Sequence, residues 1–417
     1  MNIKEAMKKL GVEKFYEFQK EVLDQLLDGR DAICIAPTGK GKSLIFQILP
    51  LLLDKLVVVI EPHLALELDQ VGKLKRKGIE AAYINSLIGD FERRKILDKI
   101  EEGTLRLLYI TPEMFQNKII RRMLKIYIPG AIILDEAHCI IKQGIGFRES
   151  YLEIAAVVET IKPRPVVAAF TATATKTTAK GIMSQLHLNC PYVHIESIRR
   201  TNIRVSVVEV GHELGGKKQK AVVEKRKREL ICKHISKVKH GKIIIYCNTV
   251  KRVEELCKYL QKKDYRAEFY HGQCDRKQAR LTDFITGKFK IMVATNAFGL
   301  GVDIPDIRLI IHHSPLMGLD DYVQEIGRAG RDGKKSKAIL LWHEYDFTIN
   351  RNLLRKEFLR LTGRELEEKL EPIQALEDYV KNSQQCRWQQ MRRFFGESAG
   401  KRCKCNCDYC KRKEELY

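Results

Sequence analysis

The sequence predicts an α/β protein with two successive parallel sheets flanked by helices, followed by a small helical module rich in cysteine. Short, fully apolar runs alternate with helical segments in the first half of the chain, and a second series of the same kind begins near residue 203. Such alternation is typical of parallel sheets that are buried on both faces. After about residue 344 the strand pattern stops, and helical periodicity leads into a group of cysteines.

Length and composition set the outer limits of this prediction. The 417 residues are too many for one compact core, and we expect three parts, residues 1–197, 198–344 and 345–417. The hydrophobic content of 44% is that of an ordinary globular protein. No apolar run reaches the ~20 residues of a membrane span, and the start does not have the pattern of a signal peptide. The formal net charge of +22 favours a polyanionic partner such as nucleic acid.

The elements of the first half can be assigned in order. Residues 1–30 have helical spacing, with Phe15, Phe18, Val22 and Leu26 on one face. Strands are expected at 32–35, 56–60, 105–110, 131–134 and 166–170. Ligands of parallel sheets bind at the carboxyl ends of the strands, so the residues that follow each strand are the candidates for chemistry.

The first candidate follows the first strand and opens a helix. Gly39 and Gly41 allow the backbone to curl around phosphates, and the helix start offers unpaired N–H groups to them. Lys42 can reach the β- and γ-phosphates from what we expect to be an open loop, and the Ser43 hydroxyl can bind Mg²⁺. The nucleotide-binding residues predicted here are Thr38, Gly39, Lys40, Gly41, Lys42 and Ser43.

Two further stretches of the first half fit the same site. Gln19 lies upstream of the loop, where its amide can read an adenine base, because it can both accept and donate a hydrogen bond. Asp135 and Glu136 follow the fourth predicted strand. An acidic residue there can hold Mg²⁺ and a second can act as the general base for the attacking water, and we assign these roles to Asp135 and Glu136. His138 is placed to relay to the second domain whether ATP or its product is bound.

The second half has strands but no second phosphate loop. Strands are expected at 203–210, 242–247, 267–270, 291–295, 308–312 and 338–342. The basic run within residues 217–228 is interpreted as a solvated helix face. Gln324 begins a stretch in which Arg328 and Arg331 stand three apart, on one face of an expected helix. Arginine can stabilise the charge of a phosphoryl-transfer transition state, so this half is expected to complete the first half's site.

The C-terminal cysteines predict a structural zinc site. Five of the 12 cysteines crowd into the last part of the chain, and Cys407 and Cys410 form a C-x-x-C pair. We predict Zn²⁺ on Cys386, Cys403, Cys407 and Cys410, with Cys405 free, because Cys405 and Cys407 are too close in sequence to share one tetrahedron easily. Cys405 in place of Cys403 stays the alternative. A redox C-x-x-C is the other interpretation, but it lacks a thioredoxin-like context.

Taken together, these motifs resemble the RecQ family of superfamily 2 DNA helicases, over essentially the whole chain. The supporting stretches are 36–43, 69–70, 85–86, 135–140, 147–148, 171–174, 200–202, 270–272, 297–306, 324–333 and the module from Cys386 to Cys410. The resemblance implies two RecA-like lobes that hydrolyse ATP with Mg²⁺ and move 3′→5′ on single-stranded DNA. It further implies a monomer that unwinds duplex or branched DNA in repair and recombination, at the nucleoid in the cytoplasm of a bacterium or in the nucleus of a eukaryote.

The resemblance also assigns roles to single residues. Arg331 matches the arginine finger, with Gln324 and Arg328 beside it in the catalytic set, and Asp303 matches a nucleotide-binding position. Phe147 and Arg148 match DNA-contacting positions.

The chain departs from the family pattern in four places. Leu10 and Tyr16 replace an aromatic residue and an arginine near Gln19, which loosens the expected adenine specificity. The loop at 141–149 lacks the family's tryptophan, histidine and aspartate, so we expect only weak stimulation of ATP hydrolysis by DNA. Lys404 stands where a zinc ligand is expected. The family's winged-helix and HRDC domains do not follow the cysteines, so a minimal helicase core with a zinc module is expected.

Two other functions stay open at this point. The motifs are compatible with an RNA helicase or translocase. The altered loop is compatible with a nucleic-acid-binding regulatory protein whose ATP hydrolysis is weakly coupled.

Overall fold

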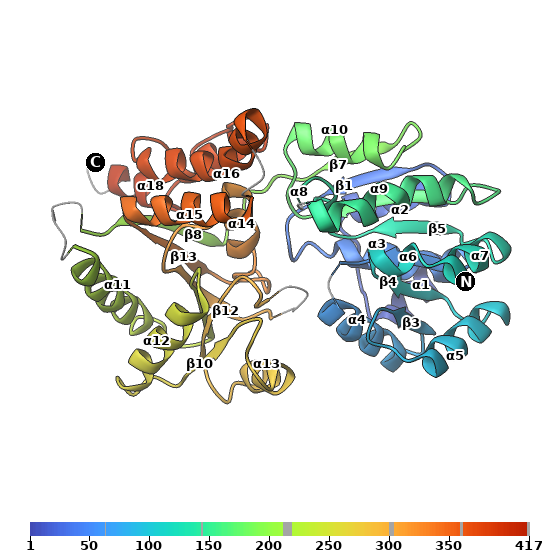
Figure 1. Cartoon of the computed structure of the whole chain (residues 1–417), viewed down its shortest axis with the longest axis horizontal. Coiled ribbons are helices and arrows are strands. Elements are labelled where there is room, and N and C mark those ends of the chain that lie inside the picture. The colour runs from blue at the N-terminus through green and yellow to red at the C-terminus, as the bar shows by residue number, and fades with distance from the viewer. Residues whose placement is uncertain (63, 143–144, 212–218, 300–303, 359–361, 415–417) are drawn as a thin grey trace. The chain divides into compact units, whose positions relative to one another are not determined.

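The computed structural model describes residues 1–417 except 63, 143–144, 212–218, 300–303, 359–361 and 415–417 (Figure 1). The chain forms two compact units, one from Met1 to Ser197 and one that begins at Ile198, and each is described by itself. Among the helices described, none is both long and apolar enough to cross a membrane.

The first unit is built on a seven-stranded sheet in which all neighbouring strands are parallel. The strands are β1 (Ala32–Ile35), β2 (Val57–Ile60), β3 (Ala81–Ile84), β4 (Leu107–Ile110), β5 (Ala131–Leu134), β6 (Val166–Thr171) and β7 (Tyr192–Ile195). Their order in space is β3-β4-β2-β5-β6-β1-β7. The five central strands confirm the predicted apolar runs. The sequence does not predict the edge strands β3 and β7, because β7 alternates half-buried with exposed residues and β3 begins with two alanines, which have a weak strand preference.

Helices cover both faces of this sheet. They are α1 (Ile3–Leu10), α2 (Glu17–Leu27), α3 (Lys42–Leu53), α4 (Leu64–Arg76), α5 (Asp90–Glu101), α6 (Pro112–Phe115), α7 (Lys118–Ile126), α8 (Cys139–Lys142), α9 (Ile145–Glu159) and α10 (Lys176–Gln185). Strand β2 sends Val57 and Val59 into a core shared with α1–α4, and Val58 and Ile60 into a core shared with α5 and α7–α10. The expected helical stretch 1–30 is two helices, because Gly11 adopts a left-handed conformation that ends α1.

The second unit contains a six-stranded sheet that is also parallel throughout. Its strands are β8 (Ile203–Glu209), β9 (Lys242–Tyr246), β10 (Ala267–Tyr270), β11 (Ile291–Ala294), β12 (Ile307–His312) and β13 (Ser336–Trp342), in the order β10-β11-β9-β12-β13-β8. Its helices are α11 (Gln219–Ile235), α12 (Val250–Gln261), α13 (Lys277–Thr286), α14 (Leu319–Ile326), α15 (Glu344–Glu357), α16 (Gly363–Lys381), α17 (Arg387–Phe394) and α18 (Asp408–Glu414). All six strands confirm the predicted runs to within two residues. The two sheets and the helical module confirm the predicted fold class.

The basic helix α11 is not simply a solvated face. Lys227 is fully buried and forms an ion pair of 2.7 Å with Asp346 at the start of α15. Burial lowers the pKa of Lys227, while Asp346 opposes this effect. The interpretation of the whole run as a solvated surface is therefore wrong for Lys227, which a charge-counting argument cannot separate from its exposed neighbours.

Candidate nucleotide-binding, arginine and metal sites

The predicted phosphate loop connects β1 to α3. Gly39 and Gly41 both have positive φ angles, of 80° and 71°, so the loop has the backbone curl that glycine allows. Lys42 is 9% exposed, and its Nζ donates a 2.6 Å hydrogen bond to the carbonyl of Ala36. The expectation that Lys42 lies in an open loop is therefore wrong. The ammonium group folds back over the loop and shields a backbone carbonyl that would otherwise be buried without a donor.

Gln19 on α2 holds the same loop through hydrogen bonds to its backbone carbonyls. Its Nε2 donates to the carbonyls of Lys40 (3.1 Å) and Gly41 (2.8 Å), and its Oε1 accepts from the N–H of Tyr16 (2.8 Å). A Cβ atom on Gly41 would lie 2.6 Å from this Nε2, so a side chain at this position would displace the Gln19 amide from the loop. Both ends of the predicted adenine-reading amide are thus engaged with the protein in this structure.

The acidic turn that follows β5 is joined to the phosphate loop through β6. The N–H of Ala36 donates to the carbonyl of Thr171 (3.1 Å), and the N–H of Ala137 donates to the carbonyl of Phe170 (2.9 Å). The last two residues of one strand therefore hold both candidate motifs. The Thr171 hydroxyl also lies 3.0 Å from Nδ1 of His138. This arrangement brings the phosphate loop and the acidic turn to one end of one sheet.

The acidic turn combines two adjacent carboxylates with the positive charges of Lys42 and His138. Burial and then the charge of Glu136 raise the pKa of Asp135 to about 7, while the Lys42 ammonium lowers it. Burial lowers the pKa of His138, but the sulfur of Cys139 and the carboxylate of Glu136, 3.3 Å away, outweigh this and raise it to about 10. Two adjacent carboxylates in a buried site are ionised together most easily beside a cation. Carboxylate and hydroxyl oxygens, which Asp135 and Ser43 offer, are the kind of ligand that Mg²⁺ prefers.

The arginine stretch of the second unit does not form a helix. Helix α14 contains Gln324 and ends at Ile326, and Arg328 and Arg331 lie in the turns that follow, which we call the arginine loop (residues 327–334). The prediction that both arginines share a helix face is therefore wrong, because Gly327 ends the helix and Gly330 has a φ of 54°. Arg328 is buried and donates to the carbonyl of Gly299. Arg331 is half-buried.

Some predicted positions fall outside the part of the chain that the structure describes. Asp303 is one of them. Phe147 and Arg148 belong to the first turns of α9, but their side chains are outside the described set, as is the neighbouring Gln143. Their nucleic-acid and nucleotide roles stay predictions.

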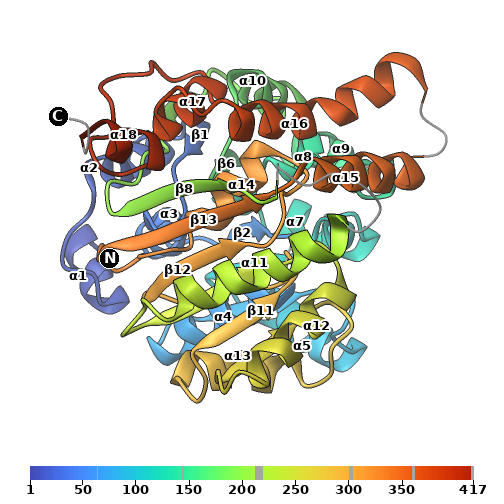
Figure 2. The same cartoon turned by 90° about the vertical axis from the view of Figure 1, so that its left-hand side faces the viewer.

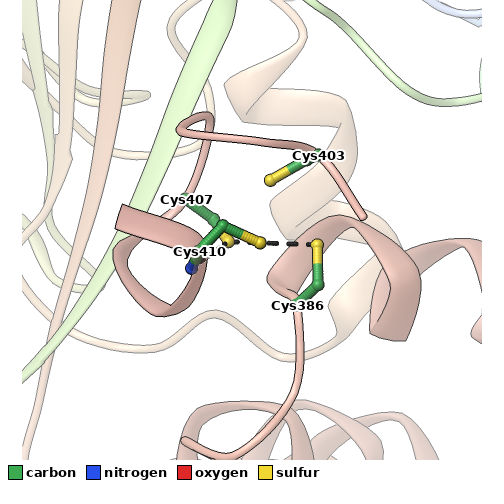
Figure 3. A group of neighbouring side chains, drawn as sticks. All are labelled: Cys386, Cys403, Cys407 and Cys410. Carbon is green, nitrogen blue, oxygen red and sulfur yellow. Dashed lines mark hydrogen bonds between the residues drawn. The ribbon is translucent and has the colours of Figure 1, made fainter. Parts of the chain in front are cut away.

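Four cysteines come together at the C-terminal end. The sulfur atoms of Cys386, Cys403, Cys407 and Cys410 all lie within 4.8 Å of one another, and all four residues are buried (Figure 3). A tetrahedral Zn²⁺ with bonds of about 2.3 Å requires sulfur atoms about 3.8 Å apart, so the four thiols fit this ion. The backbone N–H of Cys410 donates to the Cys407 sulfur (3.4 Å), which is a contact suited to a thiolate. Cys405 is exposed.

Sequence reasoning missed the side chains that hold the arginine loop. Arg200 donates to the carbonyls of Gly327 (3.1 Å), Ala329 (3.3 Å) and Gly330 (3.0 Å). Asn202 donates to the carbonyls of Gly330 (2.8 Å) and Lys334 (3.1 Å). The signal was present, since residues 200–202 are among the family motifs, but a motif does not say which carbonyls its side chains will reach.

Three family models match the chain. They are the DEAD/DEAH box helicase at residues 16–181, the helicase conserved C-terminal domain at 226–333 and the RecQ zinc-binding family at 344–411. The chain is 33% identical over 403 residues to the ATP-dependent DNA helicase RecQ of Pasteurella multocida, and covers 60% of that protein's length. It is 34% identical over 352 residues to the ATP-dependent DNA helicase RecQ of a Synechocystis species, and covers 71% of that protein.

Solved helicase structures share the fold. One is Saccharomyces cerevisiae Dbp5 bound to RNA and ADP BeF3, with a TM-score of 0.65 and 16% identity over 89% of this chain and 96% of that one. At this identity the likeness shows that the two parallel sheets are RecA-like lobes.

Proposed function

The chain belongs to the RecQ family of ATP-dependent DNA helicases, and from this membership we propose that it hydrolyses ATP to move 3′→5′ along single-stranded DNA and to unwind duplex or branched DNA. The chain spans about 60% of the length of the first RecQ relative named above. The observation that carries the proposal is the convergence of the phosphate loop and the acidic turn on the end of β6.

Each residue of this site has a role that its environment supports. Lys42 leaves the Ala36 carbonyl and contacts the β- and γ-phosphates of ATP. Ser43 and Asp135 would hold Mg²⁺, which supplies charge neutralisation at the phosphates when bound. Glu136, next to the His138 ring, takes the proton of the attacking water. Thr38, Gly39, Lys40 and Gly41 surround the phosphates with the loop backbone.

The second unit contributes the arginines. We assign Arg331 to the transition-state charge of the transferred phosphoryl group, since it matches the arginine finger of the family and is half-buried. In this proposal Gln324 belongs to the catalytic set with the arginines, and Asp303 adds a nucleotide contact. Cys386, Cys403, Cys407 and Cys410 would hold one Zn²⁺ with a structural role, since four thiolates leave no open position for chemistry.

ATP turnover of the Lys42→Ala variant tests the site. We expect hydrolysis to fall below detection while DNA binding is retained, because the phosphate-reaching cation is lost and the net positive charge is spread over the whole chain. Because Lys42 is buried, thermal unfolding must show that the variant is folded. Lys99→Ala is the matched control, since Lys99 is exposed and pairs only with Glu80 on the surface. Undiminished hydrolysis in folded Lys42→Ala would overturn the assignment.

Four substrates separate the proposal from its alternatives. We expect ATP turnover to rise with single-stranded DNA more than with RNA, and unwinding to require a 3′ rather than a 5′ tail. The stimulation should be weak for this family, because the loop at 141–149 lacks a large aromatic group other than Phe147. Stronger stimulation by RNA would favour an RNA translocase. Nucleic-acid binding without turnover would favour a regulatory protein.

A further inference from the structure

The turn between Cys403 and Cys407 packs against the free edge of the second sheet. Strand β8 pairs with β13 on one side, and on its other side Val205 forms a parallel bridge with Cys407. The N–H of Val205 donates to the carbonyl of Asn406 (3.1 Å). Figure 2 shows α17 and α18 beside β8. The cysteine turn therefore continues the hydrogen bonding of the sheet beyond its last strand.

Asn406 is the junction of these contacts. Its backbone carbonyl also accepts from the indole Nε1 of Trp388 (3.2 Å), and its own N–H donates to the carbonyl of Lys404 (2.8 Å). Its side-chain Nδ2 donates to the carbonyl of Thr201. The position of Asn406 is thus fixed by the cysteine turn, and Asn406 in turn fixes the backbone just before β8.

The backbone at Thr201 leads directly to the arginine loop. Thr201 stands between Arg200 and Asn202. The side chains of these two neighbours donate five hydrogen bonds to backbone carbonyls within residues 327–334. The fit is tight at Gly330, where a Cβ atom would lie 2.6 Å from Nδ2 of Asn202. A displacement of residues 200–202 would strain the five hydrogen bonds that these two side chains make to the arginine loop.

We propose that the cysteine turn positions the arginine loop through Asn406, residues 200–202 and the loop carbonyls. Asn406, Arg200 and Asn202 are positioning residues in this scheme, because none of them has to touch the nucleotide. The proposal rests on the assignment of Arg331 to ATP hydrolysis. It gives the zinc module a task in the ATPase cycle that is separate from holding its own helices together.

The Asn406→Ala variant tests this scheme. We expect kcat for ATP to fall about fivefold with KM for ATP unchanged, since one hydrogen bond is lost and the first unit's phosphate loop is untouched. Zinc content should stay at one ion per chain. Amide hydrogen exchange without nucleotide should become faster at residues 327–334, which is a readout independent of activity.

The matched control is Asn382→Ala in the same module. The Asn382 side chain accepts a 3.3 Å hydrogen bond from the N–H of Gln384, within its own segment of the module, so kcat and loop exchange should stay unchanged. Asn202→Ala serves as a second variant that breaks the same series of contacts at its other end, and should reproduce the effect on exchange. In an Arg331→Ala background, Asn406→Ala should lower kcat no further.

The outcomes separate the two proposals. If Arg331→Ala leaves hydrolysis intact, the assignment of the arginine fails and the positioning scheme fails with it. If Arg331→Ala abolishes hydrolysis but zinc-loaded Asn406→Ala and Asn202→Ala keep normal kcat and normal exchange at 327–334, the positioning scheme alone is overturned. If Asn406→Ala does not fold, the result for Asn202→Ala decides.

Discussion

The phosphate loop of the first unit and the arginine loop of the second are held in the same way. In each, an amide or guanidinium group donates to two or more carbonyls of the loop: Gln19 to the phosphate loop, Arg200 and Asn202 to the arginine loop. In each, a glycine with positive φ lies where a Cβ atom would come within 2.6 Å of the clamping nitrogen. Gly41 has this place in the first loop and Gly330 in the second.

The difference lies in what holds the clamp. Gln19 is anchored within its own helix start, through the Tyr16 N–H three residues earlier. Arg200 and Asn202 precede an edge strand, and their backbone is fixed by Asn406, which is 205 residues from Thr201 in the chain. The phosphate loop presents backbone N–H groups, whose positions follow from the loop itself. The arginine loop presents side chains, whose positions depend on distant parts of the second unit.

The largest expected effect in this comparison belongs to Arg331. Replacing Arg331 with alanine should lower kcat for ATP roughly 10³-fold or more, because it removes charge that acts on the transition state. Arg328→Ala should instead show a lowered unfolding temperature, since Arg328 is buried and bonded to Gly299. Steady-state kinetics and thermal unfolding of both variants check this. A large kcat loss in Arg328→Ala with none in Arg331→Ala would reverse the two roles.

The second largest effect is expected when a zinc-binding cysteine is replaced, which should change both the zinc content and the thermal stability. Cys403→Ser should weaken zinc binding by roughly two orders of magnitude and lower the unfolding temperature, because metal binding contributes directly to folding such a module. Cys405→Ser should behave like the unmodified chain, since Cys405 is exposed and outside the group of four. Metal analysis of the purified variants measures this. Zinc retained in Cys403→Ser and lost in Cys405→Ser would show that the ligand set is wrong.

The smallest effect is expected at Gln19. Gln19→Ala should raise KM for ATP about fivefold, because two contacts that close the phosphate loop are lost. Both ends of the Gln19 amide form hydrogen bonds to the protein. We therefore expect kcat/KM to fall by the same factor for ATP and for GTP. Gln25→Ala, on the same helix, is the control, because Gln25 contacts Arg30 at the surface. A selective loss for ATP would show that the amide turns to the adenine when nucleotide binds.

The fold class and the motifs of both loops could be predicted from the amino-acid sequence. Central strands of a parallel sheet are continuous apolar runs, and the glycine and lysine of a phosphate loop are adjacent in the chain, so both leave local signals. The cysteine set could also be proposed from spacing, because a metal site constrains how closely its ligands follow one another.

Other features depend on contacts between residues that are far apart in the chain. The edge strands β3 and β7, the buried Lys227 and the closed position of Lys42 depend on neighbours that a local pattern does not contain. The turn that carries Arg328 and Arg331 looks helical in sequence, but its carbonyls are taken by Arg200 and Asn202. The link from Asn406 to Thr201 joins residues that no spacing relates. Such contacts follow from how the elements pack, because a side chain's hydrogen-bond partner is set by the folded backbone beside it and not by its sequence neighbours.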